Sequence, residues 1–246
     1  MKAFLLAAGQ GTRLHPYTAD CPKCLIPIHG RPLMAYWFDL FRRHGVSEVL
    51  VNTHHHAQQV AAFLEASRPH YGFDIHSVFE PTLLGSGGTV VANRSFVEGG
   101  GPFFIVYADN LSGVDLTAMR HAHQRGEALG AVLTMGLFRA PVPEAAGIAE
   151  MDDQGRIVRF TEKPAQPVGN LANAGIYVAT DAVIETACRV QARMPAAVLD
   201  FGHHVLPELV GRMVGCTIDT YHRDIGTIDA YLSALKEWSD NQGGIT

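Results

Sequence analysis

Short runs of apolar residues alternate with amphipathic stretches along the first part of the chain. Residues 2–7 consist of a lysine and the apolar run that follows it, and glycine bounds this run at position 9, which is typical of a buried strand. Residues 32–44 repeat apolar side chains at helical spacing, and Gly45 follows them as a stop signal. The pattern also predicts strands at 48–52, 74–79 and 103–107 and a helix at 57–66. This alternation of strands and helices predicts a parallel sheet with helices on its faces.

The second part of the chain continues the alternation and adds a hairpin. Asp152-Asp153-Gln154-Gly155 has hairpin turn chemistry and lies between apolar runs at 148–151 and 157–162. The remaining expected helices lie at 115–125, 181–191, 203–211 and 227–238, and the remaining strands at 131–138, 174–179 and 216–221. Because no linker or internal repeat interrupts the pattern, we expect one α/β domain over residues 1–246.

Composition narrows the class of protein. The chain has 246 residues, of which 47% are hydrophobic, so it can bury a substantial core. The net charge of −5 disfavours broad nucleic-acid binding. No apolar run approaches the ~20 residues that span a bilayer, and the first apolar run is too short for a signal peptide. We therefore expect a cytoplasmic protein with no membrane or nucleic-acid partner.

Two local patterns resemble a redox site and a metal site, but we expect neither to act as one. Cys21 and Cys24 have the spacing of a redox pair, yet no thioredoxin-like context surrounds them, so we expect all four cysteines to be free thiols. Three adjacent histidines at 54–56 cannot all face one ion from regular structure. We interpret them as a strand end and a loop rather than a metal site.

A glycine-rich loop with two cations follows the first strand. Gly9 and Gly11 permit close approach of the backbone to an anion and conformations that a side chain would forbid. Arg13 can fork across phosphate oxygens, and Lys23 adds a mobile point charge. A strand that leads into backbone N–H groups flanked by cations is typical of a polyphosphate site.

A carboxylate is expected near this loop. The buried run at 103–107 ends at Ala108-Asp109-Asn110, so Asp109 lies at the carboxyl end of a strand. Ligands of such sheets bind at the carboxyl ends of their strands, and the glycine loop lies at such an end too. The pattern therefore predicts that Asp109 lies near the phosphates.

The string from Leu5 to Ile28 resembles the signature of the sugar-1-phosphate nucleotidyltransferases, L-A-A/G-G-x-G-T-R-L-x-P-x-T-x-x-x-P-K-x-L-x-P-I. The resemblance implies a Rossmann-like three-layer sandwich with a mixed, mostly parallel central sheet. It implies a nucleotide-binding half at about 1–110 and a sugar-phosphate-binding half at about 111–240. Arg13 and Lys23 would be catalytic. The implied nucleotide-binding residues are Leu6, Ala7, Ala8, Gly9, Gly11, Thr12, Arg13, Lys23, Glu80 and Gly85, the last two beside the base.

Later motifs extend the resemblance in family order. Phe160-Thr161-Glu162-Lys163-Pro164 matches F-x-E-K-P, and Asn173-Ala174-Gly175-Ile176-Tyr177 matches the segment that closes over the sugar. By this match Glu162 accepts hydrogen bonds from sugar hydroxyls and Lys163 holds the sugar phosphate. The implied sugar-phosphate-binding residues are Asn110, Gly147, Glu162, Lys163, Asn173 and Gly175.

The resemblance also implies one cofactor, Mg²⁺, held by Asp109 and Asp224. The chain departs from the family at Ala108, where glycine is common, and at 220–223, where a tryptophan is usual. Neither departure removes a carboxylate.

The substrates expected from the resemblance are an NTP and a sugar 1-phosphate. Chain length and the segment 84–88 resemble the mannose- or heptose-1-phosphate guanylyltransferase branch. A glucose-1-phosphate thymidylyl- or uridylyltransferase is a close alternative. A cytidylyltransferase for phosphocholine-like alcohol phosphates and a non-catalytic nucleotide-binding module are further alternatives, and a homo-oligomer stays open.

Overall fold

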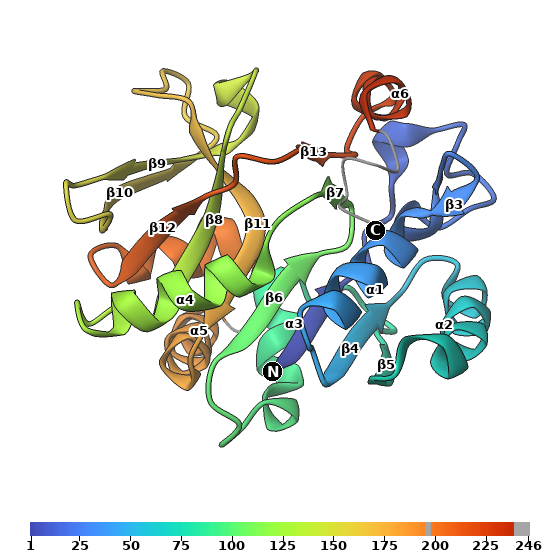
Figure 1. The fold of residues 1–246 in the computed structure, drawn as a ribbon, viewed down its shortest axis with the longest axis horizontal. Coiled ribbons are helices and arrows are strands. Elements are labelled where there is room, and N and C mark those ends of the chain that lie inside the picture. Colours follow the sequence, from blue (N-terminus) through green and yellow to red (C-terminus); the bar gives the residue numbers. More distant parts are fainter. Residues whose placement is uncertain (195–197, 239–246) are drawn as a thin grey trace. The chain divides into compact units, whose positions relative to one another are not determined.

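The computed structural model describes residues 1–194 and 198–238, and its chain divides into two compact units (Figure 1). The first unit comprises Met1–Leu83, Val106–Leu116 and the chain from Asp219 onward. The second comprises Leu84–Ile105 and Thr117–Ile218. The chain therefore leaves the first unit and returns to it twice. The division into a nucleotide half and a sugar half is a functional one and stays a prediction.

The first unit contains the expected parallel strands. β1 (Lys2–Leu6) pairs in parallel with β4 (Glu48–Thr53), and β4 pairs in parallel with β5 (Asp74–Phe79). The helices α1 (Leu33–Arg43) and α2 (Ala57–Tyr71) follow β1 and β4 in the sequence. Each of these elements was predicted, but α2 runs on to Gly72, which ends it in a left-handed conformation. Val60, Leu64 and Ser67 are the buried residues that dock this helix.

Short elements of the first unit bring together the segments that carry the candidate site. β2 (Pro27–Ile28) pairs with β3 (Arg31–Pro32), and β7 (Asn110–Ser112) pairs with β13 (His222–Asp224). α6 (Ile228–Glu237) follows β13, as predicted for 227–238. An apolar cluster stabilises this arrangement, and its buried members are Leu14, Ile26, Ile28, Leu33, Tyr36, Leu111, Ile225, Tyr231, Ala234 and Trp238.

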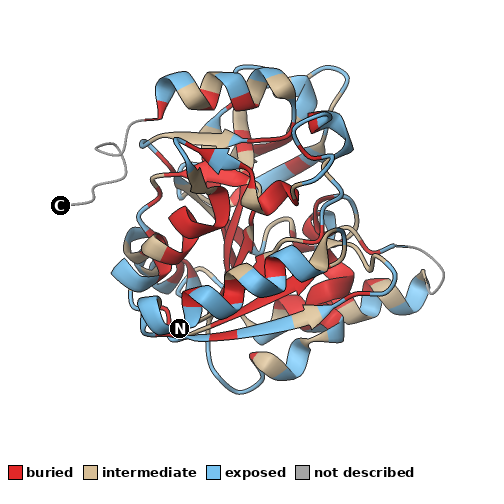
Figure 2. Cartoon of the chain, turned by 90° about the vertical axis from the view of Figure 1, so that its right-hand side faces the viewer, coloured by how far each residue is buried: buried red, intermediate tan, exposed pale blue. Residues whose placement is uncertain are grey.

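The second unit is a mixed sheet with helices. Its elements are α3 (Ser86–Ala92), the start of β6 (Phe103–Tyr107), α4 (Leu116–Glu127), β8 (Leu133–Arg139), β9 (Gly147–Met151), β10 (Ile157–Glu162), β11 (Leu171–Ala179), α5 (Asp181–Arg193) and β12 (Met213–Thr217). β9 and β10 form the predicted antiparallel hairpin. β11 is antiparallel to β8, whereas β12 is parallel to β8. The α/β class and the mixed sheet are therefore confirmed, and burial along the strands and helices can be followed in Figure 2.

Two predictions near the carboxyl end were wrong. The segment 203–211 is not one regular helix, since a π-helical turn (Phe201–Val205) leads into a 3₁₀ turn (Leu206–Leu209). Pro207 lies inside the predicted helix and has no backbone N–H to continue an α-helical ladder. The strand predicted at 216–221 overlaps only the end of β12 (Met213–Thr217), and β13 (His222–Asp224) begins after the predicted segment.

Candidate active site

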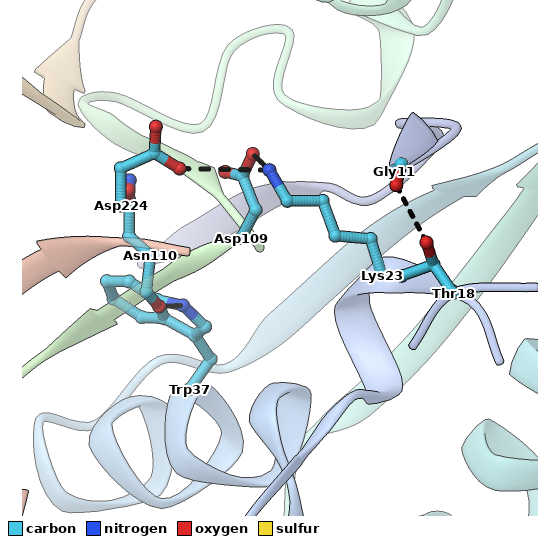
Figure 3. A network of polar contacts seen from close by, with 7 residues as sticks. All are labelled: Gly11, Thr18, Lys23, Trp37, Asp109, Asn110 and Asp224. Carbon is cyan, nitrogen blue, oxygen red and sulfur yellow. Dashed lines mark hydrogen bonds and ion pairs between the residues drawn. The ribbon is translucent and has the colours of Figure 1, made fainter. Parts of the chain in front are cut away.

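The glycine loop of the first unit is built around Gly11. Gly11 has φ 68°, a left-handed conformation, and precedes a short 3₁₀ turn at Thr12–Leu14. A Cβ atom at this position would lie 3.1 Å from the Cβ of Lys23 and 3.1 Å from Cγ2 of Thr18. The buried Thr18 hydroxyl donates to the Gly11 carbonyl at 2.7 Å (Figure 3). Gly11 is therefore required both for its backbone conformation and for its close contact with the segment that carries Lys23.

Lys23 is buried and joins both predicted metal ligands. Its Nζ lies 2.5 Å from Oδ2 of Asp109 and 3.7 Å from Oδ1 of Asp224 (Figure 3). Burial alone would lower the pKa of Lys23, but the two carboxylates outweigh it, and the pKa is raised. The ammonium group is thus held charged and in place by the acids that it bridges.

The meeting of Asp109 and Asp224 is a consequence of pairing between β7 and β13. Asn110 lies opposite Asp224 in this antiparallel pair, and the Ile225 N–H donates to the Asp109 carbonyl at 2.9 Å. The buried indole of Trp37 donates to the Asn110 carbonyl at 2.8 Å and anchors the same turn. Two carboxylates far apart in sequence are therefore placed side by side by backbone hydrogen bonds.

The two carboxylates have the chemistry of a Mg²⁺ site. Desolvation raises the pKa of Asp224, and the negative charge of Asp109 adds to the effect, giving a pKa of about 6. The Asp224 side chain is 57% exposed, so the charge of Asp109 raises its pKa alongside desolvation. The two carboxylates repel each other, and the single ammonium group of Lys23 offsets only one of their two negative charges. Their oxygens can therefore bind a further cation. Mg²⁺ takes one or two carboxylates together with phosphate oxygens and waters, so the residues fit this ion.

Arg13 lies at the exposed edge of this cluster. A Cβ atom on Gly226 would be 3.2 Å from Nη2 of Arg13 and 2.8 Å from Oδ2 of Asp224, so the guanidinium and the carboxylate both border Gly226. The positive charges of Arg13 and Lys23 oppose the rise in the pKa of Asp224. An exposed guanidinium beside two carboxylates and a lysine can meet an incoming polyphosphate.

A small pocket of about 30 Å³ lies where the glycine loop meets Lys23 and Asp109. Its lining residues are Leu6, Ala7, Gly9, Lys23, Cys24, Ala108 and Asp109. The structure thus brings together the predicted residues of the glycine loop, Lys23 and Asp109. Ala8 is buried beside them, whereas Thr12 is exposed. Asn110, predicted on the sugar-phosphate side, is buried in the first unit, where its carbonyl accepts from Trp37.

Sequence reasoning missed one buried amide of the first unit. Asn52, at the carboxyl end of β4, accepts the Ala7 N–H at 2.7 Å and donates through Nδ2 to Oε1 of Glu80 at 2.9 Å. Glu80 is only 2% exposed and Asn52 only 3%. The signal that could have found it was a polar residue at the end of an otherwise apolar strand. Since Ala7 donates its N–H to Asn52, the carboxamide and not an anion satisfies that group.

The second unit holds a separate cluster around Glu162. Oε2 of Glu162 lies so close to Gly147 that a Cβ there would be 2.5 Å away, and a Cβ on Gly202 would be 3.0 Å away. Burial raises the pKa of Glu162, while Lys163 and His203 oppose the rise and Asp200 adds to it. Two glycines therefore make room for this carboxylate, which faces both acidic and basic neighbours.

Lys163 is held by its backbone rather than by its side chain. Its φ of 47° lies in the left-handed region, and its N–H donates to the Ala146 carbonyl at 3.1 Å. Its Nζ is 4.0 Å from Oε1 of Glu162, and 57% of the side chain is exposed. A non-glycine residue in this conformation is uncommon and is often found at functional sites.

Asn173 and Gly175 form a bulge in β11. The Asn173 carboxamide donates to the Tyr177 hydroxyl at 2.6 Å and accepts the Gly175 N–H at 3.0 Å. Gly175 has φ 66°, and the register to β8 shifts between Asn173 and Tyr177. The described contacts give Asn173 a role in shaping this strand, and its predicted contact with a sugar stays a prediction.

Gly85 lies at the start of α3 against a segment that sequence reasoning did not select. Gly85 has φ 82°, and a Cβ there would be 2.5 Å from the Leu199 carbonyl oxygen. That carbonyl accepts the N–H groups of Gly87 and Gly88, while Ser86 Oγ donates to Oδ2 of Asp200 at 3.2 Å. The glycine-rich turn is therefore packed on the 199–200 segment.

The other expectations can be compared with the structure. All four cysteines are free thiols, as predicted. Within the described residues no group of three or more His, Cys, Asp or Glu side chains is arranged to hold a metal ion. Among the helices described, none is both long and apolar enough to cross a membrane.

Comparison with known proteins places this geometry in a family. A family model described as nucleotidyl transferase matches residues 2–241. A UTP–glucose-1-phosphate uridylyltransferase of Synechocystis sp. is 30% identical over 96% of this chain and 63% of its own length. A protein of Oryza sativa subsp. japonica named as a mannose-1-phosphate guanylyltransferase is 27% identical over 98% of this chain and 65% of its own length. The chain thus spans somewhat less than two thirds of these relatives.

Solved structures resemble the chain as well. The crystal structure of a protein provisionally assigned as a glucose-1-phosphate thymidylyltransferase from Bacillus anthracis covers 99% of this chain and is itself 99% covered. The TM-score is 0.81 at 21% sequence identity, which shows a common fold. The expected Rossmann-like nucleotidyltransferase fold is confirmed.

Proposed function

Because the chain belongs to the nucleotidyl transferase family, we propose that it transfers a nucleotidyl group from an NTP to a sugar 1-phosphate. A phosphate oxygen of the sugar phosphate would attack the α-phosphorus, the bond from that phosphorus to the bridging oxygen would break, and pyrophosphate would leave. The observation that carries the proposal is the buried Lys23, which bridges Asp109 and Asp224 beside the glycine loop. Such an arrangement supplies a fixed cation for phosphate oxygens and two carboxylates that could hold a divalent cation.

Catalysis in this proposal is positioning and charge neutralisation. Arg13 stabilises the leaving pyrophosphate, and Lys23 binds an oxygen of the α-phosphate. Mg²⁺ held by Asp109 and Asp224 would neutralise phosphate charge and orient the reacting oxygens.

The acceptor would be bound by residues of the second unit. The Glu162 carboxylate, lined by Gly147 and Gly202, accepts hydrogen bonds from sugar hydroxyls. The exposed Lys163 ammonium attracts the sugar phosphate. A carboxylate for hydroxyls and a cation for phosphate are the two groups that a sugar 1-phosphate needs.

For the nucleotide we propose GTP, and for the sugar mannose or heptose 1-phosphate. Glu80, which borders the base by family resemblance, carries only acceptor oxygens when ionised, and the Watson–Crick edge of guanine offers two adjacent N–H donors. The Oryza relative bears the name of a mannose-1-phosphate guanylyltransferase.

Glucose 1-phosphate with UTP or dTTP is the second candidate. The Synechocystis relative, at 30% identity, bears the name of a UTP–glucose-1-phosphate uridylyltransferase. A pyrophosphate-release assay with mannose 1-phosphate and glucose 1-phosphate distinguishes the two candidates.

A pyrophosphate-release screen of the NTPs against a panel of sugar 1-phosphates tests the proposal. We expect turnover that falls by ~10²–10³ in Arg13→Ala with the fold intact, because one positioned electrostatic donor is removed. Arg43→Ala, an exposed arginine of α1, is the matched control and keeps full activity. Near-normal turnover of a folded Arg13→Ala variant would contradict the role of Arg13. If no sugar phosphate of the panel gave pyrophosphate release with any NTP, the proposed reaction would be contradicted.

A further inference from the structure

The second unit has a surface groove of about 510 Å³ that the proposed reaction does not use. α5 supplies most of its lining, and the segment that follows α3 supplies Arg94 and Glu98. All of these residues belong to the second unit, and none of them is a predicted site residue. Ile184, which is 7% exposed, and the half-buried Cys188 give the groove some apolar surface. The groove therefore has the size of a binding surface and no assigned role.

Charged groups of both signs line this groove without pairing inside the chain. The carboxylates and guanidinium groups belong to exposed residues, which are Arg94, Glu98, Asp181, Glu185 and Arg189. In the part of the chain that the structure describes, none of these five side chains forms an ion pair. Arg94 donates to the Val91 carbonyl at 3.3 Å, and Arg189 donates to the Thr186 hydroxyl at 2.8 Å. A surface that complements the groove therefore carries both signs of charge as well.

The charges along α5 are complementary to the same charges read in reverse. Asp181, Glu185 and Arg189 follow one another at four-residue spacing, so they form one ridge along the helix. The ridge carries an acid at its first end, an acid at its centre and an arginine at its last end, and its ends are ~12 Å apart at ~1.5 Å per residue. If a second α5 runs antiparallel to the first with Glu185 at the centre, Asp181 of each copy lies opposite Arg189 of the other.

The groove also compensates the acid at the centre of this ridge. An antiparallel contact brings the Glu185 side chains of the two copies near each other. Arg94 lines the same groove from the segment after α3, so each copy offers a guanidinium group to Glu185 of the other. The insertion of a ridge of one helix into the groove of another is an ordinary mode of helix packing. The aliphatic stem of Arg189 can then cover the apolar surface of Ile184.

We propose that this groove is an isologous contact surface for a second copy of this chain, with the α5 ridge of each copy in the groove of the other. A two-fold contact uses the same patch on both copies, so the patch must complement itself. The antiparallel match of Asp181 with Arg189 meets this requirement with residues of the chain alone. The inference goes beyond the proposed function and does not depend on it. Because exposed ion pairs are individually weak and screened by salt, the dimer is a reversible one.

Sedimentation velocity over a range of protein concentrations, at low and at high salt, tests the contact. We expect a wild-type dimer that weakens as the salt concentration rises. Arg189→Asp and Asp181→Arg each turn two attractive pairs into two repulsive ones, because a two-fold contact counts every substitution twice, so each weakens the dimer by at least ~10-fold. The double variant Asp181→Arg with Arg189→Asp restores it. Arg125→Asp reverses an exposed charge of α4 outside the groove and is the matched control that keeps the wild-type dimer.

A mixture of the two single variants gives a sharper test. Each variant alone repels its own copy. In a mixed pair, both arginines of the Asp181→Arg chain face both acids of the Arg189→Asp chain, so a heterodimer forms. Native mass spectrometry identifies the heterodimer, because the two chains differ in mass. A loss of folding cannot produce this result, and circular dichroism of each variant confirms that the fold is intact.

Three outcomes would overturn the inference. The first is a wild type that stays monomeric at every concentration, which would leave the groove to solvent or to a ligand that carries both charges. The second is a dimer that neither charge reversal weakens, since the copies would then meet through another surface. The third is a mixture of folded single variants that forms no heterodimer, because the contact would then lack the antiparallel match of Asp181 with Arg189.

Discussion

The two units each pair a lysine with a carboxylate, but they hold the pair in different ways. In the first unit, Lys23 lies 2.5 Å from Asp109 and only 9% of its side chain is exposed. In the second, Lys163 lies 4.0 Å from Glu162 with 57% of its side chain exposed. The first lysine is fixed before any ligand arrives, whereas the second is free to move within the reach of its backbone.

This difference has a physical meaning for catalysis. A preorganised charge in a buried position needs no reorganisation when charge develops on a reacting phosphate. An exposed lysine is screened by water and loses side-chain entropy when it binds, so each contact that it makes is worth less. We therefore expect the first cluster to govern the chemical step and the second to govern acceptor binding.

The largest expected effect comes from the metal. EDTA should abolish turnover, and Asp109→Asn should nearly do so, because the amide keeps the shape of the ligand and loses its charge. Titration calorimetry should find weak Mg²⁺ binding to the protein alone and tighter binding with nucleotide, since two carboxylates leave the rest of the coordination sphere to phosphate and water. Full activity in EDTA, or tight binding without nucleotide, would contradict the two-aspartate site.

The next effect separates the two lysines. Lys23→Met should lower kcat by roughly 10²–10³, because a fixed charge at the reacting phosphate is lost. It should also lower the free energy of unfolding by about 1–3 kcal/mol, less than for a fully buried pair because Asp109 and Asp224 are partly exposed. Steady-state kinetics and urea denaturation measure the two changes. An unchanged kcat in a folded variant would show that the pairing of Lys23 with Asp109 and Asp224 is structural only.

The matching substitution in the second unit should act on KM. Lys163→Met removes a single exposed phosphate contact, so KM for the sugar phosphate should rise by roughly 10-fold, about 1.4 kcal/mol. The KM for NTP and the stability should change little. A larger effect on the KM for NTP than on that for the sugar phosphate would contradict the assignment of Lys163 to the sugar phosphate.

Two glycines of the glycine loop in the first unit should differ in their effect on stability. Gly11→Ala should destabilise the protein by about 1–2 kcal/mol, because φ is positive and the new Cβ contacts Lys23 and Thr18. Gly9→Ala should leave stability within about 0.5 kcal/mol, since a Cβ there meets nothing within 4 Å, and should raise KM for NTP if the backbone approaches phosphate. Thermal denaturation compares the two. Equal stability losses would contradict the assigned geometry.

The smallest expected effect is a pH dependence of stability in the second unit. Burial lowers the pKa of His123 in α4, which is 1% exposed, and among the described residues its Nε2 has no hydrogen-bond partner. The folded pKa of His123 lies below the unfolded value of about 6.5, so protonation favours the unfolded chain. The free energy of unfolding is therefore unaffected by His123 above pH 6.5 and declines as the pH falls below it. The decline is at most about 1.4 kcal/mol per pH unit.

Urea denaturation at pH 7.5 and 5.5 measures this contribution. His123→Gln keeps an amide that can bond to Thr134, the partner of Nδ1 at 3.0 Å, and removes the titration. The loss of stability between the two pH values should be smaller in the variant than in the wild type. The same loss in both proteins would show that other groups cause it.

Local patterns in the sequence determined most of the elements and the identity of the family. Apolar runs and helical spacing predicted β1, β4, β5 and α1, because burial of one face is a local demand on the residues of each element. The glycine loop, Arg13 and Lys23 were also found from neighbouring residues alone. The prediction failed at 203–211, where Pro207 lacks the N–H that an α-helix needs and the chain forms π and 3₁₀ turns instead.

Only the tertiary structure decided how polar groups distant in sequence were satisfied. The pairing of β7 with β13 brings Asp224 to Asp109, and both then attract the ammonium group of Lys23. The link from Ala7 through Asn52 to Glu80 exists because three strand ends meet and each buried donor there needs an acceptor. Periodicity records which residues are buried, but it carries no record of which buried polar atoms face one another.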